Sequence, residues 1–317
     1  MYHFVRDLVH TRYPEIKGLD INLFIEQIEY IQKHYTPITM ELLMETIDSG
    51  NSLPRNSVIL SFDDGYIDHF TNVFPILNSK GIQGSFFPPA RAITQNIVLD
   101  VNKIHFILAS ETNKAKIVSL IFKKISTYRN EYNLESESYY VEKLAHPNRF
   151  DTAEVILIKR LLQVELPENL RNEIVNTLFH KFVGIAEASF SKELYMNVDQ
   201  LKCMKKNGMH IGSHGFDHYW LGRLTKDQQE NEIDLSLSFL DTIGVDKNNW
   251  SMCYPYGNYN LETIEILKNK QCKIALTTEV EIGDISSHNP LTLPRLDTND
   301  IPKNRNAEVN KWYEKLY

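Results

Sequence analysis

Residues 57–65, Ser-Val-Ile-Leu-Ser-Phe-Asp-Asp-Gly, join a short apolar run to two adjacent acidic residues. The run from Ser57 to Phe62 is uncharged and rich in β-branched and apolar side chains, a pattern typical of a strand buried on both faces. Such strands occur mainly in parallel sheets that helices cover on both sides. We therefore expect Asp63 and Asp64 to lie at the carboxyl end of a central parallel strand.

The sequence on either side of this stretch has the rhythm of an α/β protein. A helix is expected from Phe70 to Ser79, where Lys80-Gly81 ends it, and the next strand is expected at 82–88. A strand, a helix and a strand within about 30 residues form a βαβ unit, which predicts parallel pairing. The rhythm resumes after residue 198, with strands expected at 209–212, 250–254 and 273–277 and helices at 226–242 and 261–269.

Residues 96–195 differ from the rest of the chain in composition and in hydrophobic pattern. Glycine is nearly absent, and residues 155–162 and 170–182 carry amphipathic helical patterns. We interpret 96–195 as a mainly helical insertion into a domain made of residues 1–95 and 196–317.

Composition excludes several classes of protein. The 317 residues include 34 Lys and Arg against 41 Asp and Glu, and the net charge of −7 disfavours nucleic-acid binding. Three cysteines cannot build a disulfide framework. No apolar run approaches the ~18 residues of a membrane span, and the first residues lack the pattern of a signal peptide. The expectation is a cytoplasmic, enzyme-sized protein without a transmembrane segment.

The adjacent acids Asp63 and Asp64 are the first candidate site. Two neighbouring carboxylates resist joint ionisation, because like charges repel. A bound cation would relieve this repulsion, with one carboxylate as its ligand and the other kept ionised as a general base. The alternative is a pair of capping residues that open the next helix.

Three histidines spaced four apart, His210, His214 and His218, follow the strand expected at 209–212. Neutral imidazoles together with one aspartate suit Zn²⁺ in a catalytic site with open coordination positions. The alternative is a set of isolated surface or core histidines.

Two further segments could contribute polar groups. Tyr254-Pro255-Tyr256-Gly257 ends a strand in a tight turn that could aim a backbone N–H at an oxyanion, or could simply be an aromatic loop packed on the core. Arg295, in a strand expected at 291–296, could orient a carboxylate or form a surface ion pair.

Taken together, these segments resemble the polysaccharide deacetylase (NodB-homology) family, carbohydrate esterase family 4. Ser61–Gly65 is similar to its Thr/Ser-Phe-Asp-Asp-Gly motif, Ser213–His218 to its His-x3-His motif, and Tyr254–Gly257 to the Pro-Tyr of its third motif. The resemblance covers about residues 1–95 and 196–300. It implies that Asp63 is the general base, that Asp64, His214 and His218 bind a divalent metal, and that the Tyr256 N–H stabilises the oxyanion.

The sequence departs from the family pattern in two places. Cys253 stands where the third motif usually begins with arginine, and the C-terminal Leu-x-His that supplies the general acid is not evident. Both departures occur in a subgroup resembling the poly-N-acetylglucosamine deacetylases, whose barrel is circularly permuted. There an N-terminal Tyr-His-x-Val brings in the acid, which implies that His3 is the acid and that Arg295 replaces the missing arginine beside Asp63. His288 is the second candidate acid, and His210 is interpreted as non-ligating.

The resemblance implies a distorted, circularly permuted (β/α)7 barrel with a mainly helical insertion. The expected function is metal-dependent hydrolysis, with Zn²⁺ as the expected cofactor, of the N-acetyl group of an amino sugar or glycan precursor in surface-polysaccharide biosynthesis. The expected partner is an N-acetylated amino sugar, a sugar nucleotide or a lipid-linked glycan precursor. A carbohydrate O-acetyl esterase and a non-catalytic carbohydrate-binding barrel are the alternatives.

Overall fold

The computed structural model describes residues 1–316, which divide into two compact units. The first comprises Met1–Asp7, Gly18–Ile97 and the described chain from Ser191 onward, and the second comprises Leu8–Lys17 and Val98–Phe190. From the sequence we expected the borders between the two units at 95/96 and 195/196, and we did not separate Leu8–Lys17 from the residues around it. This segment groups with the second unit because Tyr13 packs edge-on against Phe106, with ring centroids 5.0 Å apart, and Lys17 pairs with Asp151.

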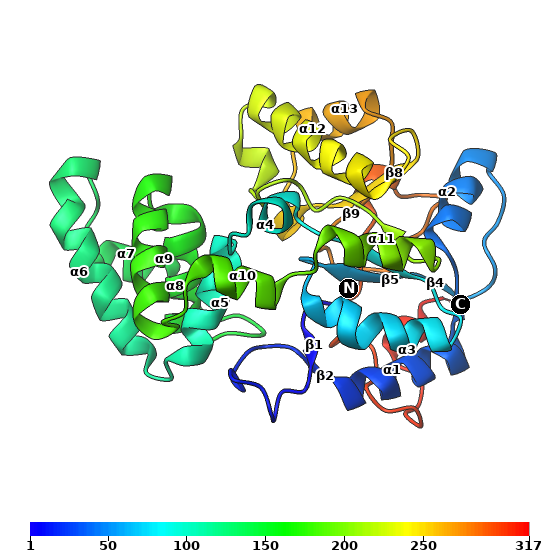
Figure 1. Ribbon diagram of the computed structural model, residues 1–317, viewed down its shortest axis with the longest axis horizontal. Helices are drawn as coiled ribbons and strands as arrows, with labels where there is room; N and C mark the ends of the chain where they lie inside the picture. The colour runs from blue at the N-terminus through cyan, green and yellow to red at the C-terminus, as the bar shows by residue number, and fades with distance from the viewer. Residues whose placement is uncertain (317) are drawn as a thin grey trace. The chain divides into compact units, whose positions relative to one another are not determined.

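The first unit is an α/β structure whose strands pair in parallel, as the sequence predicts (Figure 1). Its three-stranded sheet has the order β5 (Leu60–Asp63), β6 (Gly84–Phe87), β7 (His210–Ile211). Three further parallel pairs join β1 (Val5–Arg6) to β2 (Leu19–Asp20), β3 (Thr36–Pro37) to β4 (Ser57–Val58), and β8 (Trp250–Cys253) to β9 (Cys272–Leu276). Single parallel bridges connect Tyr2 with Phe62, Ser213 with Met252, and Leu276 with Leu293.

Two predicted strands differ in detail. The run 57–62 is interrupted at Ile59, because β4 pairs with β3 whereas β5 pairs with β6. The prediction of a strand at 291–296 is wrong. Pro290–Thr292 forms the 3₁₀ turn η5, and in this stretch only Leu293 bridges to β9. Asn289 begins this turn by accepting the Leu291 N–H at 3.0 Å, and Pro290 follows it with a backbone suited to a helical start.

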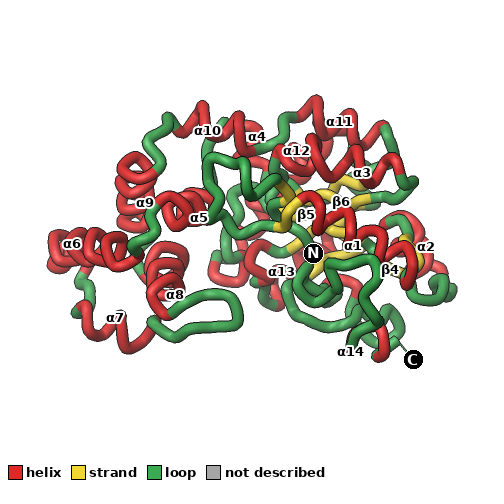
Figure 2. The backbone as a smooth tube through the Cα atoms, turned by 90° about the horizontal axis from the view of Figure 1, so that it is seen from below, coloured by secondary structure: helices red, strands yellow, loops and turns green. Residues whose placement is uncertain are grey.

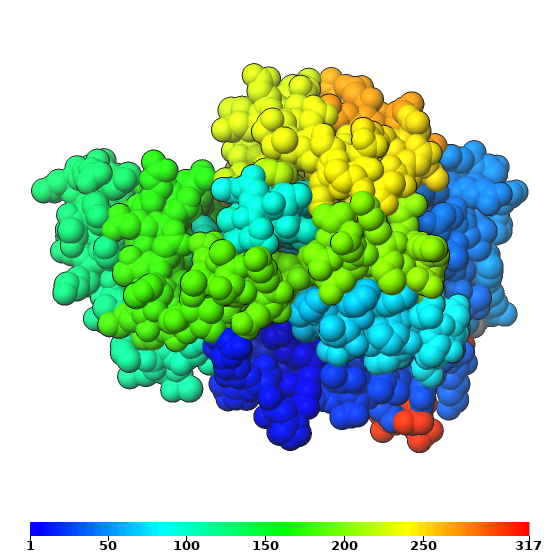
Figure 3. All heavy atoms as spheres, viewed as in Figure 1, coloured from blue at the N-terminus to red at the C-terminus, as the bar shows by residue number. Residues whose placement is uncertain are grey.

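Helices surround these strands, and Figure 3 shows the side chains of α3, α11 and α12 in succession on one face of this unit. Their ends follow local sequence. Thr225 caps α12 in a reciprocal capping box with Gln228, and Gly244 ends it in the left-handed conformation. The helices of this unit are α1 (Ile21–His34), α2 (Met40–Ser49), the π-helical η1 (His69–Val73), α3 (Phe74–Ser79), α4 (Ala90–Gln95), α11 (Val198–Lys206), α12 (Lys226–Ile243), α13 (Leu261–Asn269) and α14 (Lys311–Glu314), with 3₁₀ turns η3 (Leu221–Arg223) and η4 (Pro255–Gly257).

Aromatic side chains from the central strands fill the core of the first unit. Phe62 is fully buried and lies between the rings of Tyr2 and Phe86, with centroids 4.9 and 4.8 Å away. A second cluster packs α2 against the ends of β6, β8 and β9. The carboxyl ends of β5, β6 and β7 are therefore held by a rigid apolar interior.

The second unit is built from helices joined by loops (Figure 2). It contains α5 (Asp100–Ser110), α6 (Lys114–Tyr132), α7 (Glu137–Leu144), α8 (Ala153–Arg160), the π-helical η2 (Leu161–Glu165), α9 (Glu168–Phe182) and the start of α10 (Glu187–Leu194). Lys103 is buried within it and is compensated by Glu187 at 2.9 Å and Asn176 at 2.7 Å. None of the helices in residues 1–316 combines the length and the apolarity needed to cross a bilayer.

Gly212 provides a test of this packing. A Cβ at this position would lie 2.5 Å from the Phe87 ring and 2.7 Å from the Ser251 carbonyl oxygen. We expect Gly212→Ala to lower the free energy of unfolding in urea by about 1–3 kcal/mol through overpacking. Gly283→Ala is the control, because its Cβ would meet only the Pro294 oxygen at 3.8 Å. Equal stability of the two variants would contradict the close approach of β7 to its neighbours.

Candidate active site

Asp63 and Asp64 lie at the carboxyl end of β5, and both are buried, with exposed fractions of 1% and 3%. Asp63 is the last residue of the strand, whereas Asp64 adopts a left-handed backbone conformation with a φ of 72°. This reversal of the backbone gives the two neighbouring carboxylates entirely different partners. The repulsion expected from the sequence is therefore resolved by separating the two side chains.

Asp63 forms a two-pronged ion pair with Arg295. Arg295 Nη1 donates to Oδ1 at 2.9 Å and Nη2 donates to Oδ2 at 2.8 Å, while Nε donates to the Thr277 carbonyl at 2.8 Å. Burial alone would raise the pKa of Asp63, but the charge and hydrogen bonds of Arg295 and the nearby His214 together outweigh burial and hold this pKa below its usual value. The structure thus places Arg295 beside the candidate base and keeps that base ionised.

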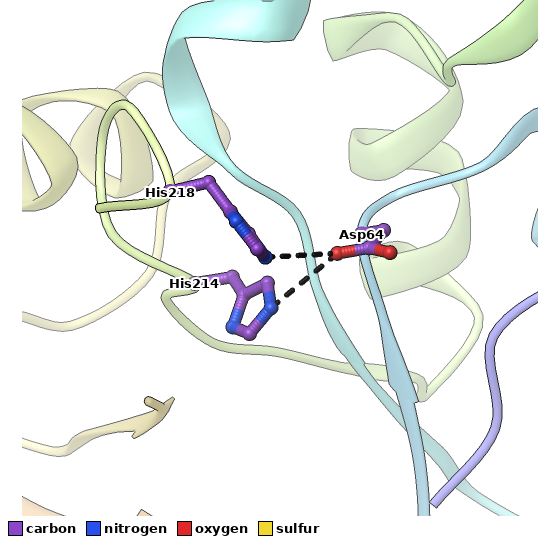
Figure 4. A group of neighbouring side chains, drawn as sticks. All are labelled: Asp64, His214 and His218. Atoms are coloured by element: carbon purple, nitrogen blue, oxygen red, sulfur yellow. Dashed lines mark ion pairs between the residues drawn. The ribbon is translucent and has the colours of Figure 1, made fainter. Parts of the chain in front are cut away.

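Asp64 faces His214 and His218 (Figure 4). The Nε2 atom of each histidine lies 3.4 Å from Asp64 Oδ1, and the ligand atoms of the three residues lie within 4.8 Å of one another. The second oxygen, Oδ2, accepts a hydrogen bond from the Tyr66 hydroxyl at 2.5 Å. Two imidazole nitrogens and one carboxylate oxygen therefore converge on one point from β5 and from the loop after β7.

This cluster fits a divalent cation. His214 Nδ1–H donates to the Cys253 carbonyl at 2.8 Å, so in the neutral ring Nε2 presents a lone pair toward Asp64. Asp64 Oδ1 has no hydrogen-bond partner among the described residues, although it is buried. Acceptor atoms that face one another in the interior without a donor are costly, and a cation among them removes that cost.

The protonation of the two histidines reflects this arrangement. Burial lowers the pKa of His214, but the nearby carboxylates of Asp64 and Asp63 together outweigh it and raise the pKa above its usual value. Burial lowers the pKa of His218, and here it prevails. This lowered pKa favours the neutral form of His218, in which histidine binds metals.

Tyr256 packs against the cluster in the turn η4. Its ring lies edge-on to His218 with centroids 4.7 Å apart and stacks on Trp220 at 4.6 Å. Its backbone is left-handed, with a φ of 57°, and Gly257 follows because a Cβ there would clash with Thr278. His218 is also left-handed, with a φ of 58°. With Asp64, three site residues other than glycine thus hold backbone conformations that cost about 1–3 kcal/mol each.

The backbone around His3 is held next to β5 and η1. Tyr2 pairs with β5 through its N–H to Ser61 O at 2.8 Å and its carbonyl to Asp63 N at 3.0 Å, and the next residue is His3. His69 Nε2 holds the His3 carbonyl at 2.9 Å. The charge of His3 is the smallest of the causes that lower the pKa of Asp63 and of Asp64.

The two remaining histidines lie elsewhere. His288 is on an exposed turn, where its Nδ1 accepts the Asp284 N–H at 3.0 Å. His210 is buried with Nδ1 3.0 Å from Glu41 Oε1 and Nε2 2.7 Å from Ser251 Oγ. Both of its nitrogens are engaged by protein atoms, so it has no atom to offer a cation.

Two contacts of the site were missed by the sequence reasoning. Tyr66 orients Asp64, and Trp220 supports Tyr256. Both aromatic residues follow a motif residue by two positions, and that proximity is the one signal that could have drawn attention to them. Their contacts depend on how the chain turns after each motif.

Comparisons with known proteins place this geometry in context. Residues 167–275 match the family model described as polysaccharide deacetylase. The match includes His214, His218 and Tyr256. It begins inside residues 96–195, the stretch interpreted as an insertion. The chain is 31% identical over 91 residues to a putative polysaccharide deacetylase, YxkH, of Bacillus subtilis, which is 29% of this chain and 32% of that protein. It is 38% identical over 55 residues to the poly-β-1,6-N-acetyl-D-glucosamine N-deacetylase of Escherichia coli K12, which is 17% of this chain and 8% of that protein. The chain thus spans about a third or less of the length of these relatives, and the matches confirm the family resemblance predicted from the motifs.

Solved structures show the same fold. The deacetylase PplD of Streptococcus pyogenes, in complex with acetate, superimposes with a TM-score of 0.57 at 16% identity, over 93% of this chain and 89% of that chain. IcaB from Ammonifex degensii superimposes with a TM-score of 0.54 at 16% identity, over 94% and 91%.

The cluster predicts how substitutions affect metal binding. We expect His214→Ala and His218→Ala each to abolish retention of a divalent ion, because each removes one of three ligands. Asp63→Asn should retain the ion, because Asp63 is engaged by Arg295 rather than by the histidines. Metal analysis of the purified proteins by mass spectrometry measures both. Full occupancy in His214→Ala would place the metal elsewhere.

Proposed function

We propose that this protein is a metal-dependent deacetylase that hydrolyses the N-acetyl group of an amino sugar in the synthesis of a surface polysaccharide. One observation carries the proposal: the adjacent carboxylates are divided between a cation-binding cluster and an arginine-held base. Deacetylation of an amide needs both parts, a site that polarises the carbonyl and a base that activates water. The names of the relatives, a polysaccharide deacetylase and a poly-N-acetylglucosamine deacetylase, support the same chemistry.

We infer Zn²⁺ as the cation held by Asp64, His214 and His218. Two neutral imidazoles and one carboxylate are a donor set that zinc accepts in catalytic sites with an open position. When bound, such an ion polarises the acetyl carbonyl and lowers the pKa of water. The carbonyl of Cys253 and the hydroxyl of Tyr66 then orient the His214 ring and the Asp64 carboxylate.

The protein groups carry the rest of the reaction. Asp63 takes a proton from the attacking water, and Arg295 keeps this carboxylate ionised and fixed in orientation. The water oxygen bonds to the acetyl carbon, and the Tyr256 N–H stabilises the negative charge that develops on the carbonyl oxygen. His3 donates a proton to the sugar nitrogen as the C–N bond breaks, which gives acetate and a free amino sugar.

We also infer the permuted (β/α)7 barrel, and the order of strand contacts supports it. From β5 the contacts run through β6 and β7, across the Ser213–Met252 bridge to β8 and β9, and across the Leu276–Leu293 bridge. The Met1 amino group donates to the Leu296 carbonyl at 2.8 Å, and Tyr2 bridges back to β5. The N-terminal segment then occupies the place of a barrel strand and carries His3 into the site.

The identity of the sugar stays a prediction. A free N-acetylated amino sugar, a sugar nucleotide and a lipid-linked glycan precursor all present the amide that this site would cleave. The cytoplasmic location likewise stays a prediction.

Release of acetate and of primary amine tests the proposed function. We expect the zinc-loaded protein to release both from N-acetylglucosamine oligomers or from an N-acetylated sugar nucleotide. Asp63→Asn should be slower by roughly 10²–10⁴-fold with its metal retained. Release of acetate from O-acetylated sugars alone would indicate an esterase, and binding of oligomers without any release would indicate a binding protein.

His3 should matter more for an amide than for an activated ester. The amine must be protonated to depart, whereas the leaving group of an activated ester departs without help. We therefore expect His3→Ala to reduce kcat/KM for N-acetyl sugars more than for 4-nitrophenyl acetate, with His288→Ala as the control. Equal losses on the two substrates would remove His3 from the role of acid.

A further inference from the structure

The loop that carries both metal-binding histidines is short and strained. Only three residues separate His214 from His218, and Gly215 and His218 are both left-handed, with φ of 73° and 58°. The peptide N–H groups of Phe216 and Asp217, between the two ligands, converge on one oxygen: Glu232 Oε2, at 3.2 and 2.9 Å. Consecutive N–H groups that converge in this way form a concave site for an anion.

Glu232 fills that site from the middle of α12. It is 5% exposed, and burial raises its pKa to about 7, with the neighbouring Asp217 adding repulsion. Asp217 itself pairs with Arg91. Burial disfavours the charged form of Glu232, and the bonds from the two loop N–H groups offset part of that cost.

The opposite side of the same loop is held by the start of α4. Ala90 N–H donates to the Gly215 carbonyl at 3.1 Å, and Arg91 N–H donates to the Phe216 carbonyl at 2.9 Å. The loop is thus fixed through its carbonyls on one side and through its N–H groups on the other. Removal of the Glu232 oxygen would release one side while the other stays bonded.

We propose that Glu232 is a positioning residue that sets the spacing of His214 and His218 for the cation. The inference rests on the metal site of the proposed function. Glu232 bonds to the backbone that joins the two histidines, and acts through it. Groups that orient metal ligands typically change metal affinity by about 10–100-fold when they are removed.

Metal affinity separates positioning from general stability. Zn²⁺ binding to the metal-free full chain is measured by competition with a chromophoric chelator, and the absorption spectrum of the Co²⁺ form reports ligand geometry. Glu232→Leu removes the accepting oxygen, and we expect zinc affinity to fall by about 10–100-fold. Glu232→Gln keeps an oxygen at the same reach, and its zinc affinity should stay within about threefold of that of the unmodified protein, which is less than the change expected for a lost orienting group.

Gln229→Leu is the matched control. Gln229 is a fully buried polar residue one turn earlier on α12, and it bonds the Leu224 carbonyl at 3.1 Å and Thr263 at 2.5 Å rather than the loop. We expect it to lower the melting temperature while zinc affinity and the Co²⁺ spectrum stay unchanged. If Glu232→Leu does not fold, Glu232→Asp replaces it, because Asp retracts the oxygen by one methylene while the charge is kept. Asp should then bind zinc more weakly than Gln.

The zinc affinities of these variants decide whether Glu232 positions the two histidines. Unchanged zinc affinity in Glu232→Leu, or an equal loss in Gln229→Leu, would overturn the role of Glu232 and leave the proposed function intact. A Gln variant as weak as Leu, or weaker than Asp, would also overturn it, since the placement of an oxygen would not be what counts. Failure of the unmodified protein to bind any divalent ion would overturn both proposals together.

Discussion

The two-pronged ion pair between Asp63 and Arg295 is the interaction on which the site depends. Adjacent carboxylates that are almost fully buried would not both stay ionised without compensation. Arg295 neutralises one of them through two short hydrogen bonds, and the left-handed turn at Asp64 carries the other away. Only because Asp63 is satisfied can Asp64 remain an open acceptor toward two histidines.

Cys253 contacts both halves of the site. It is fully buried, and its sulfur lies 3.1 Å from Arg295 Nη1, so the thiol and the guanidinium share the space beside Asp63. The backbone carbonyl of the same residue accepts the His214 Nδ1–H. Cys253 therefore packs against the arginine through its side chain and orients a candidate metal ligand through its carbonyl.

The sequence was sufficient where function depends on residues that are neighbours in the chain. Asp63-Asp64-Gly65 and His214–His218 could be predicted because strand ends and short spacings bring such residues together whatever the rest of the fold does. Contacts that depend on register could not be predicted in this way. Glu232 meets the histidine loop, and Trp220 meets Tyr256, through contacts between segments that lie far apart in the sequence. The sequence also predicted a strand at 291–296, where the structure has a 3₁₀ turn that begins with Pro290 and a single β-bridge at Leu293.

Side chains of η1, and of the residue before it, hold the segment that carries His3 in place. His69 holds the His3 carbonyl, Asn72 donates to the Val5 carbonyl at 2.8 Å, and Asp68 forms a two-pronged pair with Arg6 at 2.7 and 2.9 Å. These three residues follow Asp63 and Asp64 within a single turn-and-helix segment. The segment that follows Asp63 and Asp64 thus also holds the residues around His3, so the candidate base, candidate ligand and candidate acid are positioned by one continuous piece of structure.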